Sequence, residues 1–378
     1  MKVVTLVLMQ DLRDRASDIH IEPREDRVRV RFRIDGTLRE AMDVPAAMAS
    51  SLASRIKVMA DMNIVEKRRP QDGQFTAEID GRPVHIRVST TPTIFGEKTV
   101  LRMLDKTMSL RGLHELGMSA SFGKLLTSPF GMVICAGPTG SGKTTTLYAG
   151  LTELADPTRN VITIADPFEY VLPSINQIQV NRQAGITFAD GLKTILRQDP
   201  DVILVGEIRD VETARIAMRS ALTGHFVLSS IHATDSPTAL QRFGDMGIEP
   251  FLMTSSVLAV ASQRLIRRIC AHCREPYEPS EHERLFFERS LGHAKDTFHR
   301  GAGCNLWSNT GFAERVGIYE VLRVTDAIKE LLLRNAGHEE VRSVAVSEGM
   351  SPLRDEAMRL VDADITTFAE VARAGFVE

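Results

Sequence analysis

The segment at 137–144 restricts the fold of this chain more than any other. It reads Gly-Pro-Thr-Gly-Ser-Gly-Lys-Thr and fits the pattern G-x-x-x-x-G-K-[ST], whose glycines let backbone N–H groups curl around phosphate oxygens. In such a loop Lys143 neutralises phosphate charge and the Thr144 hydroxyl binds Mg²⁺. An apolar run precedes the segment and helix-forming residues follow it, so a chance glycine turn is the weaker interpretation. The expected nucleotide-binding residues are Gly137, Pro138, Thr139, Gly140, Ser141, Gly142, Lys143, Thr144 and Thr145.

Four short apolar runs surround this segment, at 132–136, 161–164, 202–205 and 226–231. Nearly unbroken apolar runs suit parallel strands whose two faces are both covered by helices. We therefore predict a doubly wound α/β domain from residue 118 to the end of the chain, with a helical tail after residue 324.

The residues before position 105 predict a smaller α+β domain. Apolar residues alternate with arginines at 27–34, which is typical of a strand with one buried face, and an Asp35-Gly36 turn follows. Further predicted elements are a helix within 45–62, a hairpin at 75–79 and 84–88 around Asp80-Gly81, and a strand at 99–104. The predicted domains are thus 1–105 and 118–378, with a linker at 106–117.

Composition excludes several classes of protein. The chain has 378 residues, of which 43% are hydrophobic and 25% charged, as in an average globular protein. Its formal charge of −3 gives no basic field for nucleic acid or anionic lipid. No apolar run approaches the roughly 18 residues of a membrane helix, and the run at 3–9 is too short for a signal peptide. Four cysteines favour a reducing compartment, so we expect a cytoplasmic protein.

Charged and ionisable residues stand at the ends of two predicted strands. Glu207 comes just after the run at 202–205, where it can polarise an attacking water or hold the Mg²⁺ shell. His225 and His232 flank the run at 226–231. A lone histidine is more often structural, but one at the carboxyl end of a strand can reach a nucleotide crevice.

Ordered motifs run along nearly the whole chain. They are Ala16-Ser-Asp-Ile-His-Ile-Glu-Pro23, Arg31-Phe-Arg-Ile-Asp-Gly36, Arg69-Pro-Gln-Asp-Gly73, Arg87-Val-Ser-Thr-Thr-Pro92, Gly96-Glu-Lys-Thr-Val-Leu-Arg102, the phosphate loop, Asp166-Pro-Phe-Glu-Tyr170, Leu196-Arg-Gln-Asp-Pro-Asp201, Gly206-Glu-Ile-Arg-Asp210, Ala221-Leu-Thr-Gly-His225 and Gly317-Ile-Tyr-Glu-Val321. With these motifs the chain resembles a known family, the ATPases of bacterial type II secretion and type IV pilus assembly.

The resemblance implies a homo-hexameric ring that hydrolyses ATP and drives pseudopilin or pilin assembly. Its RecA-like ATPase domain is preceded by a PAS-like α+β domain that supplies arginines to the nucleotide. The implied partners are platform proteins of the inner membrane. We expect the chain to be held at the cytoplasmic face of that membrane only through these partners, and we expect no nucleic-acid partner. The resemblance begins at the family's second domain, so we expect no amino-terminal docking domain.

The resemblance also assigns roles to single residues. Lys143 and Thr144 match the Walker A loop, Glu207 matches the Walker B glutamate, and Arg87 matches a phosphate-directed arginine of the preceding domain, with Arg102 at an interface or beside the linker. The expected catalytic residues are Glu207, Lys143, Arg87, His232, Asp166, Glu169 and His225. For Arg29 and Arg31 we expect only a solvated sheet face.

Two departures from the family pattern affect the expected nucleotide site. Gln74 stands where the family usually has a second phosphate-directed arginine, and Ala165 stands where the family has a glutamate before Asp166. Losing a preorganised charge at a phosphate lowers the rate of hydrolysis. A ring subunit with weak turnover is therefore an alternative to a full motor, and a pilus retraction motor is a separate alternative. A nucleic-acid motor fits poorly, since aromatic residues are only 6% of the chain.

A third departure affects a possible metal site in the insertion at about 268–312. Relatives in the extension branch often carry two C-x-x-C pairs that bind Zn²⁺. Here Cys270 and Cys273 form one pair, but Trp307 takes the place of the cysteine that would pair with Cys304. Three thiolates leave a tetrahedral Zn²⁺ one ligand short. Either a histidine (His272, His293 or His299) or water completes the site, or the metal has been lost.

Overall fold

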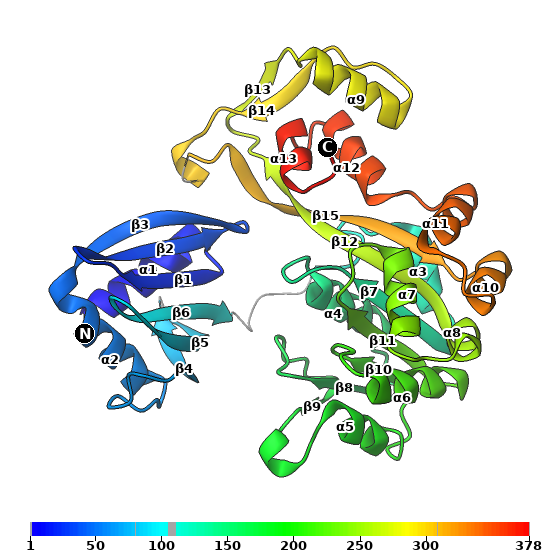
Figure 1. Cartoon of the computed structure of the whole chain (residues 1–378), viewed down its shortest axis with the longest axis horizontal. Helices are drawn as coiled ribbons and strands as arrows, with labels where there is room; N and C mark the ends of the chain where they lie inside the picture. Colours follow the sequence, from blue (N-terminus) through cyan, green and yellow to red (C-terminus); the bar gives the residue numbers. More distant parts are fainter. Residues whose placement is uncertain (1, 80, 105–110, 308, 378) are drawn as a thin grey trace. The chain divides into compact units, whose positions relative to one another are not determined.

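The computed structural model describes residues 2–79, 81–104, 111–307 and 309–377, and the chain divides into two compact units, Met1–Met108 and Ser109–Glu378 (Figure 1). The predicted linker at 106–117 lies partly outside the described residues, as does Asp80 of the second predicted turn, so the domain boundaries stay predictions. No helix in the described part of the chain is both long and apolar enough to cross a bilayer.

The first unit is a six-stranded antiparallel sheet with the order β3-β2-β1-β6-β5-β4, packed on two helices. Asp35 and Gly36 have φ angles of 47° and 82° and join β2 to β3 in the predicted turn. One sheet face carries the apolar residues that pack on the helices, and the other is polar. The elements are α1 (Lys2–Asp14), β1 (Asp18–Pro23), β2 (Arg27–Ile34), β3 (Thr37–Pro45), α2 (Ala49–Met59), β4 (Gln71–Ile79), β5 (Arg82–Thr93) and β6 (Gly96–Leu104).

The second unit is built on a seven-stranded sheet with the order β15-β12-β7-β11-β10-β8-β9. Neighbouring strands are parallel except for β15, which is antiparallel to β12. The strands are β7 (Gly131–Ala136), β8 (Val161–Ala165), β9 (Asn176–Gln179), β10 (Val202–Val205), β11 (Phe226–Ile231), β12 (Val257–Ile269) and β15 (Phe312–Arg323).

Helices cover both faces of this sheet, which confirms the predicted doubly wound α/β fold. One core lies under α3 (Ala120–Leu126) and α4 (Lys143–Leu154). The opposite core lies under α5 (Phe188–Ile195), α6 (Val211–Leu222), α7 (Ser236–Asp245), α8 (Pro250–Ser256), α10 (Asp326–Leu333) and α11 (His338–Ser347). Successive residues of β7 alternate between the two cores, which explains why the run at 132–136 has no polar residue.

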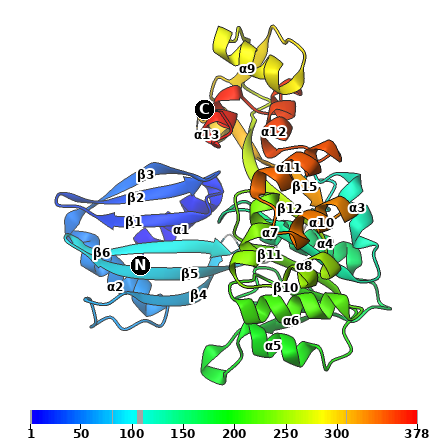
Figure 2. The ribbon, with the colours of Figure 1, turned by 45° about the vertical axis from the view of Figure 1, so that its right-hand side comes forward.

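A smaller layer forms between β12 and β15, in the predicted insertion. It contains β13 (Arg274–Tyr277), α9 (Glu281–Leu291) and β14 (Phe298–Gly301), and it lies beside α12 (Leu353–Asp362) and α13 (Phe368–Arg373) (Figures 1 and 2). Phe287 and Phe298 fill its core together with residues of α12 and α13. The described residues also form short 3₁₀ helices at Ala46–Met48, Arg182–Ala184 and Asn305–Trp307.

Candidate active site

The loop at 137–144 joins the end of β7 to the first turn of α4. Gly142 has a left-handed φ of 89°, and a Cβ atom on Gly137 would lie 2.4 Å from the Ser141 Oγ atom. Glycine is therefore required at both positions for the chain to turn this tightly. The first N–H groups of a helix have no partner within the helix, so the start of α4 can bind a phosphate, whose negative charge the helix dipole favours.

Lys143 lies inside this loop and bonds to its backbone. Its Nζ atom donates hydrogen bonds to the Gly137 and Pro138 carbonyl oxygens at 2.8 and 2.9 Å. Burial lowers the pKa of Lys143 from its ordinary value, and the negative charge of Glu207 opposes this shift. The ammonium group is thus held at the loop, where a phosphate oxygen would be a stronger, charged acceptor than either carbonyl.

Three predicted site residues follow strands that end at the same sheet edge as β7. Strands β7, β11, β10 and β8 are parallel and in register, with Ala136 beside Ile231 and Val205 beside both Ser229 and Ile164. Because their carboxyl ends meet at one edge, the loop, Asp166, Glu207 and His232 are brought together. Doubly wound folds bind ligands at the carboxyl ends of their strands, which is this edge of the sheet in the second unit.

Glu207 has the most developed electrostatic surroundings of these residues. Its side chain is 19% exposed, forms an ion pair with Arg209, and lies 3.7 Å from the His232 Nε2 atom. The hydrogen bond to Glu207 raises the pKa of Arg209. Burial and the charge of Lys143 lower the pKa of His232, so this imidazole is largely neutral near pH 7. A carboxylate beside a neutral imidazole can orient a water molecule for attack.

The backbone around Glu207 is fixed by a serine that belongs to none of the sequence motifs. Ser230 on β11 donates its hydroxyl to the Gly206 carbonyl at 2.8 Å, and its own carbonyl accepts the Ile208 N–H at 2.9 Å. These two bonds hold the turn on both sides of the carboxylate. A small polar residue in an apolar run was the only signal in the sequence that could have indicated this role.

Asp166 and Glu169 lie in the exposed segment after β8. The charge of Asp166 contributes to raising the pKa of Arg209, and the charge of Glu169 acts in the raising direction on the pKa of Lys143. Ala165 is buried, and its Cβ atom would be 3.2 Å from a Cβ atom added to Gly206. Position 165, where the family has a glutamate, therefore lies directly beside the turn that carries Glu207.

His225 is not brought to this edge, although the resemblance placed it among the expected catalytic residues. It precedes β11, and its backbone carbonyl accepts the N–H of Gly131 at the start of β7. Its Nδ1 atom lies 3.0 Å from the Ser220 carbonyl oxygen. The strand β11 separates His225 from His232, a span of about 23 Å at about 3.3 Å per residue. The two histidines flank the strand symmetrically in sequence, but the direction of the strand brings only His232 to the nucleotide edge.

In the first unit, Gln74 and Arg87 are direct neighbours across β4 and β5. Arg102 pairs with Arg87 across β5 and β6, and its Nε atom donates to the Asp18 Oδ1 atom at 2.8 Å. These side chains share the polar face of the sheet, since the alternate residues of β5 are buried against the helices. A lost arginine at Gln74 would thus reduce the positive charge beside Arg87. The role of Arg87 itself stays a prediction.

Arg29 and Arg31 do more than face solvent, contrary to our expectation. Both bind Glu22, whose side chain is only 6% exposed, at 2.9 and 2.8 Å, and Lys98 lies 3.2 Å from the same carboxylate. Burial alone would raise the pKa of Glu22, but these cations lower it to about 2. The arginine strand therefore holds a buried carboxylate on the polar face.

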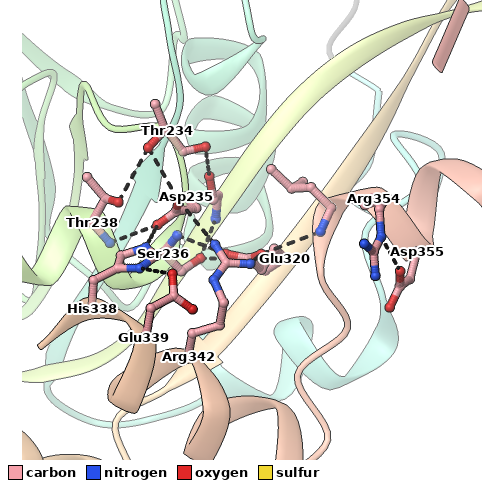
Figure 3. A network of polar contacts seen from close by, with 12 residues as sticks. Thr234, Asp235, Ser236, Thr238, Glu320, His338, Glu339, Arg342, Arg354 and Asp355 are labelled. Atoms are coloured by element: carbon pink, nitrogen blue, oxygen red, sulfur yellow. Dashed lines mark hydrogen bonds and ion pairs between the residues drawn. The ribbon is translucent and has the colours of Figure 1, made fainter. Parts of the chain in front are cut away.

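A polar network anchors the segment that follows His232 (Figure 3). Asp235 lies 3.0 Å from the His338 Nε2 atom and 3.2 Å from the Arg342 guanidinium, both on α11. Glu320 on β15 is 1% exposed; it accepts the Ser236 N–H at 2.8 Å and lies 3.9 Å from Arg342. This network joins α7, β15 and α11 behind the nucleotide edge, and its residues are too far apart in sequence to be recognised there.

The three predicted metal ligands form a compact cluster. The Sγ atoms of Cys270, Cys273 and Cys304 lie within 4.8 Å of one another, and those of Cys270 and Cys304 are 3.7 Å apart. Tetrahedral Zn²⁺ with bonds of about 2.3 Å needs sulfur atoms about 3.8 Å apart, so this spacing fits. The backbone N–H groups of His272 and Gly303 also bond to sulfur, as second-shell donors to metal thiolates do.

Two of the three histidines expected as a fourth ligand, His293 and His299, are bonded elsewhere. His293 lies 3.3 Å from Asp362 and His299 lies 2.9 Å from Asp364, at the end of α12 and just after it. Within the described residues, the cluster that could hold a metal consists of the three cysteines without a histidine. The donors available to a metal at this cluster are therefore the three cysteine thiolates.

Comparison with known proteins gives a consistent result for sequence and fold. Residues 1–373 match the family "Type II/IV secretion system protein". The type II secretion system ATPase E of Vibrio cholerae is 45% identical over 376 residues, which cover 98% of this chain and 74% of that protein. The type IV pilus assembly ATPase PilB of Myxococcus xanthus is 43% identical over 380 residues, covering 98% and 67%.

Two solved structures share the fold at lower identity. The pilus retraction motor PilT with bound ADP has a TM-score of 0.66 at 22% identity, covering 98% of this chain and 96% of that one. The ATPase DotB of Legionella pneumophila has a TM-score of 0.72 at 20% identity, covering 97% and 94%. With the phosphate loop and the carboxylate at one sheet edge, these matches leave one conclusion: the chain belongs to the type II/IV secretion system protein family of ATPases.

Proposed function

We propose that this chain hydrolyses ATP with Mg²⁺ at the loop 137–144 and that this turnover powers pseudopilin or pilin assembly at the cytoplasmic face of a bacterial inner membrane. The observation that carries the proposal is the meeting of the loop, Glu207 and His232 at one edge of the sheet. The names of the relatives, a type II secretion ATPase and a pilus assembly ATPase, support the same function.

Each group at this edge has a distinct task in the proposed reaction. The loop N–H groups and Lys143 bind the β- and γ-phosphates, and Thr144 holds Mg²⁺, whose charge neutralises the phosphate oxygens. Glu207 orients the attacking water. His232, kept neutral by its lowered pKa, donates a hydrogen bond to the γ-phosphate or to that water. Asp166 and Glu169 add carboxylates on the Mg²⁺ side.

The proposed working form is a homo-hexamer. Head-to-tail interfaces close a ring and let one chain complete the site of another, which suits the placement of Arg87 in a separate compact unit. Arg87 would bring a positive charge to the γ-phosphate as it departs. Platform proteins of the inner membrane would bind the ring and hold it at the membrane, and we expect no nucleic-acid partner.

Phosphate release at steady state, measured with ATP and Mg²⁺ on size-separated oligomers, tests the proposal. Lys143→Ala should abolish nucleotide binding or turnover because the loop loses its side-chain cation. Glu207→Gln should keep ATP binding and suppress hydrolysis, since the shape stays and the charge is lost. His232→Ala should slow turnover, whereas His293→Ala, in the exposed part of the insertion, should not. Normal turnover in both Lys143→Ala and Glu207→Gln would contradict the assignment of the site.

A ring subunit with weak turnover is the second candidate. Gln74 removes a charge beside Arg87, and Ala165 removes a carboxylate beside the turn of Glu207. Each loss acts on the transition state of phosphoryl transfer, so slow hydrolysis with ordinary ATP binding would favour this candidate. Retraction of a pilus is a further alternative, against which the cysteine insertion argues.

We also propose that Cys270, Cys273 and Cys304 hold one Zn²⁺, with water as the fourth ligand. The sulfur spacing and the N–H donors to sulfur support this assignment. Bound Zn²⁺ would fix the insertion to the end of β12, where Cys270 directly follows Ile269.

A further inference from the structure

Gln263 lies against the phosphate loop from a strand that carries none of the recognised motifs. It belongs to β12, which pairs in parallel with β7 and places Ser262 beside Ala136. Gln263 is the next residue of β12, and Gly137 is the first residue after β7. Gln263 is 0% exposed, and its Nε2 atom donates a hydrogen bond to the Ser141 carbonyl oxygen at 2.6 Å.

The side chain fits closely to the loop. A Cβ atom on Gly137 would lie 2.8 Å from the Gln263 backbone carbonyl, and one on Gly142 would lie 3.1 Å from the Gln263 Nε2 atom. The glycines of the loop therefore leave room for this strand as well as for a phosphate. A displacement of the amide would be felt directly by the loop backbone.

The hydrogen bond to the Ser141 carbonyl satisfies only one end of the Gln263 amide. The Gln263 Oε1 atom is buried and has no hydrogen-bond partner among the described residues, and the same holds for the Ser141 Oγ atom. Burying an amide with an unsatisfied acceptor costs free energy that an apolar side chain of the same length would not. The Nε2 donor is what distinguishes glutamine from methionine here.

The stereochemistry of the peptide bond shows what this donor controls. In a trans peptide the C=O and N–H bonds point in opposite directions, and the Ser141–Gly142 bond is not among the cis bonds of the described chain. A Ser141 carbonyl directed at Gln263 therefore directs the Gly142 N–H the opposite way. Glycine with a φ of 89° lets this peptide rotate at little steric cost, so the loop by itself does not fix it.

We propose that Gln263 is a positioning residue for the phosphate loop. Its amide fixes the Ser141–Gly142 peptide so that the Gly142 N–H points toward the β-phosphate of a bound nucleoside di- or triphosphate. The inference rests on the proposed function of the loop as an ATP site. Gln263 does not touch the nucleotide, and it acts only through the direction of that N–H group.

The substitution Gln263→Met keeps the length of the side chain and removes the donor. Calorimetric titration of the full chain should show ADP and ATP binding about three- to tenfold weaker, the range of one neutral hydrogen bond. The N–H contacts phosphate in the ground state and the transition state alike, so KM should rise in proportion while kcat changes by less than about twofold. Gln263→Glu, which replaces the donor by an acceptor at the same size, should weaken binding at least as much.

Thr366→Val is the matched control, because Thr366 Oγ1 also donates to a backbone carbonyl, that of Arg267 on the same strand, at 2.8 Å. It should lower the melting temperature without weakening nucleotide binding. Affinity within about twofold of wild type in either folded Gln263 variant, or equal loss of affinity in the control, overturns the inference. Failure of the wild type itself to bind ADP would instead overturn the proposed function.

Discussion

Asp11 is expected to make the stability of the first unit depend strongly on pH. It lies on α1 and is 0% exposed, and neither of its carboxylate oxygens has a hydrogen-bond partner among the described residues. Burial, followed by the negative charges of Asp18 and Asp14, raises the pKa of Asp11 from 3.8 to about 8. The folded state therefore holds a proton near neutral pH that the unfolded state releases.

The sign and size of the effect follow from this shift. Below about pH 4 the carboxyl is protonated in both states and costs nothing electrostatically. Between about pH 4 and pH 8 the unfolded state gains charge that the folded state cannot accept, so stability falls as pH rises, by about 1.4 kcal/mol per pH unit. At pH 7 this penalty reaches about 4 kcal/mol, on the order of a third of the stability of an ordinary domain.

Asp11→Leu removes the titration and places an apolar side chain in the core of the first unit. Its unfolding free energy should exceed that of wild type by about 3 kcal/mol more at pH 7 than at pH 5. Urea unfolding at several pH values measures this difference. Unfolding is followed with a deuterium-labelling pulse at one fixed pH and mass spectrometry of peptides from the first unit. Asp26→Asn, at an exposed position between β1 and β2, is the control. Parallel pH profiles for wild type and Asp11→Leu would refute the reasoning.

The other predictions concern the nucleotide site, the cysteine cluster and the polar network around Arg342. Gln74→Arg made together with Ala165→Glu should raise steady-state phosphate release at least about tenfold, or about 1.4 kcal/mol of barrier, and no gain in the same oligomer would mean that the site is not weakened. Elemental analysis of tag-free protein should find one zinc per chain, falling below half in Cys304→Ser; zinc near zero in wild type would show a lost site. Arg342→Gln should lower the unfolding free energy of the second unit by about 2 kcal/mol, since it faces two carboxylates, whereas the exposed Arg354→Gln should cost less than about 0.5 kcal/mol in the same urea titration. Equal losses would contradict the network.

The sequence predicted best those parts of the fold in which a local pattern decides the structure. The runs at 132–136, 202–205 and 226–231 became β7, β10 and β11 because both faces of each strand are covered. The Asp35-Gly36 turn followed from residues that tolerate positive φ. By contrast, β1 and α1 were not among the predicted elements, because their burial depends on strands that come later in the chain.

The candidate site shows the same division between local and distant determinants. The loop and Glu207 could be proposed from the sequence because each comes just after an apolar run, whereas Asp166 was assigned from the family motif alone. The positions of His225 and His232 could not be told apart from the sequence, because a histidine at either end of an apolar run gives the same local pattern and only the direction of the strand separates the two. The ion pairs of Arg31 with Glu22 could not be foreseen either, since an alternating arginine face is typical of a solvated strand.

Strand β12 shows why the residues that hold the site in place are the hardest to predict from sequence motifs. Three consecutive residues of β12 bond to two loops at the nucleotide edge, the phosphate loop at 137–144 and the loop at 232–236 that follows β11. Gln263 donates to the Ser141 carbonyl of the first loop at 2.6 Å. Ser262 donates its N–H to the Ser236 hydroxyl at 3.2 Å and Arg264 donates to the Thr234 carbonyl at 2.7 Å, both in the second loop. More than a hundred positions lie between Ser141 and Gln263 in the chain. The motifs identify the groups that would contact a phosphate. The direction of those groups depends on β12, which contributes no group to the proposed reaction. A change in the backbone of either loop must therefore be accommodated by the same three residues.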